Sequence, residues 1–168
     1  AAEQLARTDR EFLRETCRKL LWSLSDESGG IGWSAPELLG EIVASDPRSF
    51  RDIIPLIAGV FDIEETVFRA GALYALGRIA ERAPELVLEQ QAVILEALGD
   101  RDPAVRVRCI RLIGILRKNA KESSTGLLEA VRSKMHGFLN DRSEAWIYEG
   151  SGFISIVIGD EARELIEK

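Results

Sequence analysis

Residues of one physical kind recur along this chain at a fixed spacing of 37 positions. One series consists of small residues, namely Gly40, Gly77, Gly114 and Ser151. Another consists of large apolar residues, namely Leu24, Phe61, Leu98 and Met135. A period of this size is typical of stacked supersecondary units, each of which buries its apolar face against the next. The spacing therefore predicts a repeat protein rather than a single closed core.

Each period contains two stretches in which apolar residues recur at offsets of three, four and seven, which place them on one face of a helix. The apolar stripes of the four second helices recur in register. They are Ala35, Leu38, Leu39 and Ile42; Ala72, Ala75, Leu76 and Ile79; Cys109, Leu112, Ile113 and Leu116; and Trp146, Glu149, Gly150 and Phe153. We expect the recurring glycine to lie beside this stripe, where a missing side chain lets neighbouring helices approach closely.

These patterns predict an all-α fold, a right-handed α-solenoid of four antiparallel helix pairs in a single domain over residues 1–168. The units span about 8–46, 47–83, 84–120 and 121–159, and a short terminal helix follows over 160–168. Residues 154–158 are mostly β-branched, which is typical of a strand, but the register favours a helix there as well. A sheet near the carboxyl end would contradict this prediction.

Local signals at the helix ends agree with the repeat. Ser34 and Glu37 have the spacing of a capping box, with a proline between them in the first turn. Thr8 and Glu11 have the same spacing at the start of the first helix. Pro55 falls inside a helical pattern, so we expect that helix to begin late or to kink.

Two segments resemble HEAT repeats. The segment Asp-Pro-Ala-Val-Arg at 102–106, followed by 112–115, resembles the second helix of a HEAT repeat, and 67–79 resembles the variant found in phycobiliprotein lyases. The resemblance spans nearly the whole chain and is closest in units two and three. It implies stacked helix pairs whose second helices line a concave face. It implies no single activity, because most HEAT-repeat proteins are scaffolds that bind other proteins.

Composition narrows the classes of partner. The net charge of −6 disfavours a general affinity for nucleic acid or anionic lipid, and no apolar stretch is long enough to cross a bilayer. Cys17 and Cys109 both fall on apolar helix faces and are not in a CxxC or Cys/His pair. We expect buried thiols of a cytoplasmic protein, with a disulfide or a metal role as the alternative.

A binding face follows from projecting the second helices at 100° per residue. Two rows of outward-facing residues lie opposite the apolar stripe of these helices, and basic residues are concentrated between 103 and 118. Tyrosine and arginine are frequent among the residues on which interfaces depend most. We predict that a partner protein binds on a concave face formed by Glu37, Glu41, Tyr74, Arg78, Arg108, Arg111 and Tyr148. The alternative is a solvated face without a specific role.

The loop between the helices of unit one departs from the repeat. Three glycines replace residues that begin the second helix in other units, so this helix should begin about a turn late. The loop lacks the lysine of a phosphate loop and the alternating oxygen ligands of a calcium loop. Three interpretations stay open: a structural connection, part of a partner surface, or a small-ligand site. Its candidate residues are Asp26, Glu27, Gly29, Gly30 and Trp33.

Residues for catalysis are scarce. His136 is the only histidine and falls on the polar side of a helical pattern, where no Ser/His/Asp or Cys/His arrangement can be assembled around it. Glu149 replaces an apolar residue of the repeat, either as a buried carboxylate with a perturbed pKa or as a solvated or arginine-paired residue at the end of the stack.

We therefore expect a non-enzymatic interaction module without a cofactor or a metal ion, whose partner is another protein and whose oligomeric state stays open. One alternative is a nucleic-acid-binding protein similar to the HEAT-like alkylpurine DNA glycosylases, although an isoelectric point near 5.0 makes nucleic acid an unfavourable partner. The other is a protein similar to the bilin lyases, which the repeat variant suggests.

Overall fold

The computed structural model describes residues 9–24, 32–150 and 152–167, which are mostly helical and include one two-stranded sheet. The elements follow one another as α2 (Arg10–Leu24), α3 (Ala35–Ser45), α4 (Ile54–Gly59), α5 (Thr66–Ala80), α6 (Pro84–Leu88), α7 (Gln91–Ala97), α8 (Pro103–Ala120), α9 (Thr125–Phe138), β1 (Glu144–Glu149), β2 (Gly152–Val157) and α10 (Ile158–Glu167). Short 3-10 turns span Arg51–Ile53, Val60–Asp62 and Lys121–Ser124.

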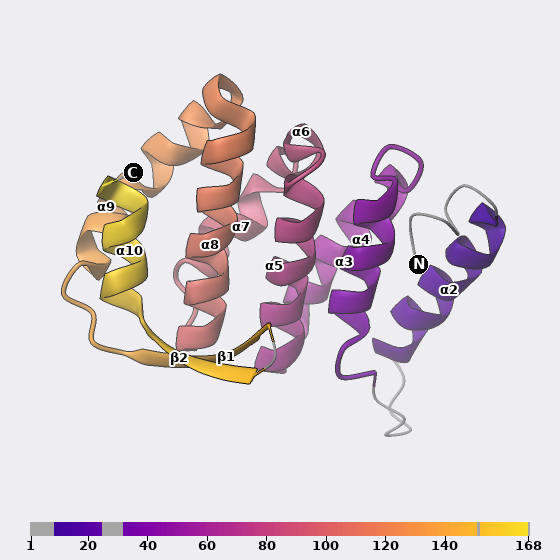
Figure 1. Cartoon of the computed structure of the whole chain (residues 1–168), viewed down its shortest axis with the longest axis horizontal. Helices are drawn as coiled ribbons and strands as arrows, with labels where there is room; N and C mark the ends of the chain where they lie inside the picture. Colours follow the sequence, from indigo (N-terminus) through magenta and orange to yellow (C-terminus); the bar gives the residue numbers. More distant parts are fainter. Residues whose placement is uncertain (1–8, 25–31, 151, 168) are drawn as a thin grey trace.

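The longer helices stand side by side (Figure 1). Helix α2 packs on α3, α3 on α5, α5 on α8, and α8 on α10. The shorter helices α4, α6 and α7 connect these helices, and α9 precedes the sheet. The helices α2, α3, α5, α8 and α10 therefore lie next to one another in the order in which they follow in the chain.

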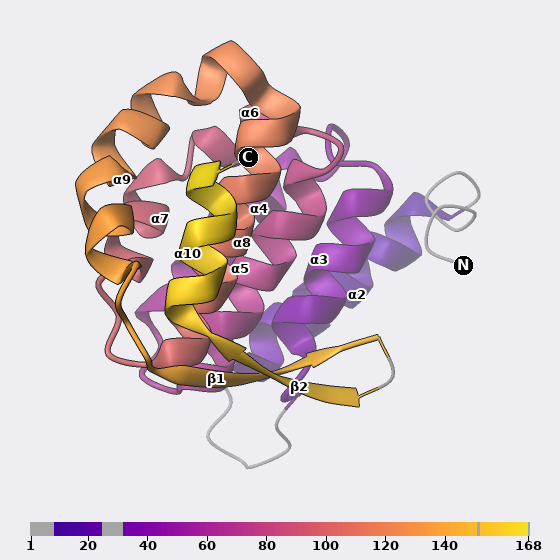
Figure 2. The ribbon, with the colours of Figure 1, turned by 60° about the vertical axis from the view of Figure 1, so that its left-hand side comes forward.

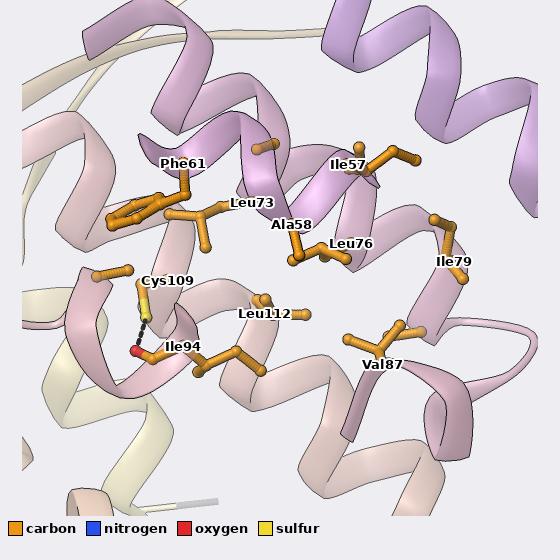
Figure 3. Packing of buried hydrophobic residues seen from close by; sticks show 14 of the residues in the cluster. Ile57, Ala58, Phe61, Leu73, Leu76, Ile79, Val87, Ile94, Cys109 and Leu112 are labelled. Carbon is orange, nitrogen blue, oxygen red and sulfur yellow. Dashed lines mark hydrogen bonds between the residues drawn. The ribbon is translucent and has the colours of Figure 1, made fainter. Parts of the chain in front are cut away.

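The predicted apolar stripes form the core in the first three units. Leu76, Ile79 and Leu112 are almost wholly buried, and they meet the buried side chains of α4, α6 and α7 (Figure 3). Burying one such side chain contributes about 1.5–3 kcal/mol. Leu38 is an exception, because 52% of it is exposed. Its assignment to the buried stripe was wrong, since it lies on the exposed side of α3.

Both cysteines are buried and free, which confirms the predicted burial. The thiol of Cys109 donates a hydrogen bond to the Ile94 carbonyl at 3.2 Å, as Figure 3 shows. Burial raises the pKa of Cys17 to about 11 and raises the pKa of Cys109 further. Both thiols therefore stay protonated at neutral pH.

The expected helix starts are confirmed in part. The segment before Pro55 forms a 3-10 turn, and α4 begins only at Ile54 with the proline in its first turn. Helix α3 begins at Ala35, whereas the position in register with the first residues of α5 and α8 is Gly29, so α3 is late as predicted. The capping box at Ser34 is wrong, because its side chain makes no capping hydrogen bond. Thr8 lies outside the described residues, and Asp9 caps α2 through the Phe12 amide at 3.0 Å.

The recurring glycine allows a close approach at one position only. A Cβ atom on Gly40 would lie 2.5 Å from the Cα of Ala75, so α3 and α5 are in backbone contact there. At Gly77 and at Gly114 the nearest atom would be the end of an aliphatic side chain, at 3.4 Å in each case. The prediction of a packing role is confirmed at Gly40, and the other two positions are not close approaches.

Buried ion pairs link the repeats at their connections. Arg69 of α5 bonds to Asp100 through Nε at 2.9 Å, and the two side chains are 10% and 9% exposed. The same guanidinium donates to the carbonyls of Ile63 and Glu64. Arg106, which lies 37 residues after Arg69, bonds to the Asp100 carbonyl at 2.8 Å. These arginines tie the connection between two helices of one unit to the next unit.

The second helix predicted for the fourth unit does not exist. Strands β1 and β2 form an antiparallel hairpin in which Trp146 lies opposite Ser155 and Glu149 lies opposite Gly152. Ala145 and Ile147 are buried while their neighbours are exposed, an alternation that suits a strand and not a helix. Gly150 in the turn has φ +62°, which glycine adopts readily. The prediction of four in-register helix pairs is therefore wrong at the carboxyl end.

The predicted terminal helix is present as α10, which begins at Ile158 and packs against α8 and α9. Figure 2 shows α10 beside α8, with the hairpin extending below the helices. Gly159 lies inside this helix and not at the end of a preceding one. The hairpin thus occupies the connection between α9 and α10, and α10 takes the place next to α8.

Candidate functional site

A hollow of about 1220 Å³ lies between the hairpin and the helices α3, α5 and α8. The hairpin runs across the ends of α5 and α8 from which these helices begin, at the bottom of Figure 1. The amino-terminal turns of the three helices line one side through Leu38, Val67 and Ala104, and β1 lines the other. The hollow thus exists because the hairpin interrupts the repeat.

The structure brings most of the predicted site residues together. Six of the seven predicted for the concave face line the hollow: Glu37, Glu41, Tyr74, Arg78, Arg108 and Tyr148. Arg111 does not, because it lines a second hollow of about 830 Å³ between α8 and α10. Trp33 lines the first hollow and stacks on Phe68 with ring centres 6.0 Å apart. The loop candidates Asp26, Glu27, Gly29 and Gly30 lie outside the described residues.

Glu41 and Arg78 form an ion pair between neighbouring repeats. The two residues are 37 positions apart, and Arg78 Nε lies 2.7 Å from Glu41 Oε1. The Tyr74 hydroxyl donates to the same oxygen at 3.0 Å, and Arg78 also pairs with Glu81. The hydrogen bond from Arg78 lowers the pKa of Glu41 below its usual value. This end of the hollow is electrostatically satisfied.

Arg108 connects α8 to the hairpin. Its guanidinium lies over the Tyr74 ring, 5.1 Å from the ring centre, and donates to the Tyr148 carbonyl at 3.0 Å. Burial lowers the pKa of Arg108, although the group stays protonated at neutral pH. Arg108 therefore holds the tip of β1 against the helices and fixes the width of the hollow.

Glu37 is the unsatisfied group of the hollow. Its Oε2 atom is buried without a hydrogen-bond partner, one of two such side-chain atoms in the described residues. The carboxylate packs against the backbone of Gly71, where a Cβ atom would lie 2.9 Å from Oε2. Burial raises the pKa of Glu37 above its usual value, while a hydrogen bond with its own backbone and the charge of Arg108 oppose this shift. Gly71 thus makes room for a carboxylate of which one oxygen, Oε2, has no hydrogen-bond partner among the described residues.

We expect Glu37→Gln to stabilise the fold at pH 7 by less than about 1 kcal/mol, since solvent screens this partly exposed group. A raised folded-state pKa means that Glu37 favours folding only when protonated, and this contribution is lost as the pH rises through the folded pKa. The gain should therefore vanish below the ordinary value of 4.5. Urea unfolding at several pH values measures it, with Glu89→Gln as an exposed control. A gain that persists in acid would contradict the assignment.

Exposed aromatic side chains surround the hollow. Trp146 is 65% exposed and Phe153 is 70% exposed, and the Tyr148 ring meets the edge of the Phe153 ring with centres 5.5 Å apart. The helical register had assigned Trp146 and Phe153 to the core, and this was wrong. The signal that identifies them is local: short runs rich in aromatic and β-branched residues lie on both sides of Gly150 and Gly152, which is typical of a hairpin.

Other residues singled out in the sequence have structural partners. Glu149 is exposed on β1 and pairs with Arg111 at 2.6 Å, so it is the arginine-paired carboxylate and not a buried one. His136 is exposed on α9, with Nδ1 2.8 Å from the Arg132 carbonyl. Within the described ranges no group of three His, Cys, Asp or Glu residues could hold a metal ion, and none of the helices seen there is long and apolar enough to cross a membrane.

Comparison with protein-family models, with curated proteins and with solved structures found no match. The function is therefore argued from the geometry of the hollow.

Proposed function

We propose that this chain is a HEAT-like α-solenoid that binds a segment of a partner protein in the hollow and catalyses no reaction. The cluster of exposed aromatic side chains carries the proposal. Trp146, Tyr148 and Phe153 are all more than half exposed around one concave surface. Exposed apolar patches in a concave setting mark interaction sites, and interfaces depend most on aromatic residues and arginine.

The solenoid part of the proposal is supported by the order of the helices. Helices α3, α5 and α8 lie next to one another in chain order, and Glu41 pairs with Arg78 across one 37-residue period. Helix α10 packs on both α8 and α9, so α9 and α10 form a fourth pair with the hairpin inserted between them. Such a stack presents its second helices on one side, which is where the hollow lies.

Nucleic acid has less support as the partner, because the arginines of α8 already have partners. Arg106 pairs with Asp141, Arg111 pairs with Glu149 and Glu161, and Arg117 donates to the Leu165 carbonyl. A phosphate backbone would have to displace these contacts, and each phosphate contact normally needs a free cation.

The experiment uses a displayed library of 16-residue segments tiled across the proteome of the source organism. Segments selected on the immobilised protein are synthesised, and their affinity for the wild-type chain is measured by calorimetry. We expect Trp146→Ala and Phe153→Ala to weaken binding at least tenfold, because each removes a large exposed anchor. Neither side chain is part of the core, so both variants should keep the melting temperature of the wild type.

Phe12→Ala is the matched control, because Phe12 is 55% exposed on α2 and does not line the hollow. It should bind the selected segments as tightly as the wild type does. Segments that bind all three variants equally would remove the hollow as the binding site, and with it the proposed function.

A further inference from the structure

The outer edge of β1 carries backbone groups that do not pair with β2. In an antiparallel pair, residues that exchange backbone hydrogen bonds alternate with residues that do not. The Ile158 amide donates to the carbonyl of Ser143, the residue opposite it, at 3.1 Å. Counting on in steps of two, the backbone groups of 145, 147 and 149 also face β2. The carbonyls and amides of 144, 146 and 148 therefore point away from β2.

A contact of Arg108 independently supports this assignment of which backbone groups point away from β2. Arg108 donates to the Tyr148 carbonyl from α8, which is possible only because that carbonyl points away from β2. The bond occupies one position of the edge, and among the described residues no segment other than β2 hydrogen-bonds to the backbone of Trp146 or Glu144. Every residue of β1 lines the hollow, whichever face its side chain is on. The edge itself thus borders the hollow.

An unpaired strand edge is a template for an added strand. Natural proteins protect such edges with charged side chains, above all lysine, with prolines or with covering segments. β1 contains no lysine and no proline, and of its outward-phase residues Glu144, Trp146 and Tyr148 only the first is charged. The hairpin has only two strands, and a third strand would stabilise it further.

The charge of the hollow indicates what kind of side chain the added strand carries. The lining contains five carboxylates and two guanidinium groups, a net charge of −3. Four of the carboxylates have partners: Glu41 bonds to Arg78, Asp102 to the Ala104 amide, Glu144 to Ser155 and Glu149 to Arg111. Within the described residues Glu37 Oε2 has none, although the side chain as a whole is only half-buried and lines the hollow. A cation of the ligand in the hollow would stabilise the charged form of this carboxylate.

Resting on the proposed function, we propose that the partner segment binds in an extended conformation as a third strand on the outer edge of β1. A lysine or arginine of the segment pairs with Glu37, and apolar side chains two residues away contact Trp146 and Leu38. The segment is thus a basic and apolar peptide of another protein.

Two modifications of the selected segments test this. Replacing the basic residue with norleucine should weaken binding to the wild type about tenfold, and should have no effect on Glu37→Gln. Glu89→Gln, which removes the same charge outside the hollow, should keep the tenfold loss. Methylating the backbone amides one at a time should weaken binding at every second residue, because a strand directs alternate amides towards its neighbour.

The outcomes separate the inference from the proposed function. Segments that need Trp146 and Phe153 but tolerate norleucine, or that show no two-residue period on amide methylation, would overturn the inference and leave the proposed function standing. Sedimentation of the protein alone should show a monomer. A dimer that Trp146→Ala dissociates would overturn the inference by assigning the edge to a second copy of this chain.

Discussion

Replacing Arg69 with methionine is expected to lower the free energy of unfolding by about 3–5 kcal/mol, because it leaves the carboxylate of Asp100 buried without its cation. The Arg69 guanidinium contacts Asp100 and the Ile63 and Glu64 carbonyls, and both charged side chains are about nine-tenths buried. Methionine keeps most of the aliphatic volume, so the loss reports the polar contacts. Urea denaturation followed by circular dichroism measures it.

The control is Arg18→Met on α2. Arg18 pairs with Glu11 and Glu15, but its side chain is 58% exposed, and solvent-exposed ion pairs contribute little to stability. If Arg69→Met cost no more than Arg18→Met, the buried pair would not hold the repeats together.

Replacing Gly40 with alanine is expected to destabilise the fold by about 1–3 kcal/mol, although alanine is the better helix former by about 1 kcal/mol. The new Cβ atom would lie 2.5 Å from the Cα of Ala75 and 2.7 Å from its Cβ. Neither atom can rotate away, so α3 and α5 must separate along their contact. The measurement is the melting temperature together with the free energy of unfolding.

Gly77→Ala is the informative control, because Gly77 occupies the same repeat position 37 residues later. There the nearest atom is Ile115 Cδ1 at 3.4 Å, which is the mobile end of a side chain, so we expect an unchanged or slightly higher stability. Gly126→Ala on α9, where no atom lies within 4 Å, should be stabilising. Equal losses at Gly40 and Gly77 would show that the repeat position, and not the helix contact, sets the cost.

The sequence predicted the second helices of the first three units and their order because their apolar residues repeat with the helical period. The first helix predicted for unit three is instead divided into α6 and α7. Leu76, Ile79 and Leu112 are buried as that period requires. The same projection predicted that Glu37, Tyr74 and Arg78 share a face, since polar residues opposite a buried stripe must point outward.

The hairpin could not be read from the repeat. The 37-residue spacing carries Leu116 of α8 to Phe153 of β2, so the period continues into a segment that folds as strands. The period describes which kind of residue recurs at each position and does not specify the backbone conformation there. Trp146 and Phe153 fit the apolar register, yet the segment folds as a strand in which Ala145 and Ile147 are buried and Trp146 is exposed.

The amino-acid sequence by itself determined that α2, α3, α5 and α8 form and which of their faces are mainly buried, because both follow from the spacing of apolar residues along one segment. Only the tertiary structure decided that the hairpin lies across the ends of α5 and α8 and that Arg108 reaches the Tyr148 carbonyl. It also decided that Glu37 Oε2 has no hydrogen-bond partner among the described residues. These features depend on contacts between segments about 40 to 110 residues apart, which no local spacing can specify.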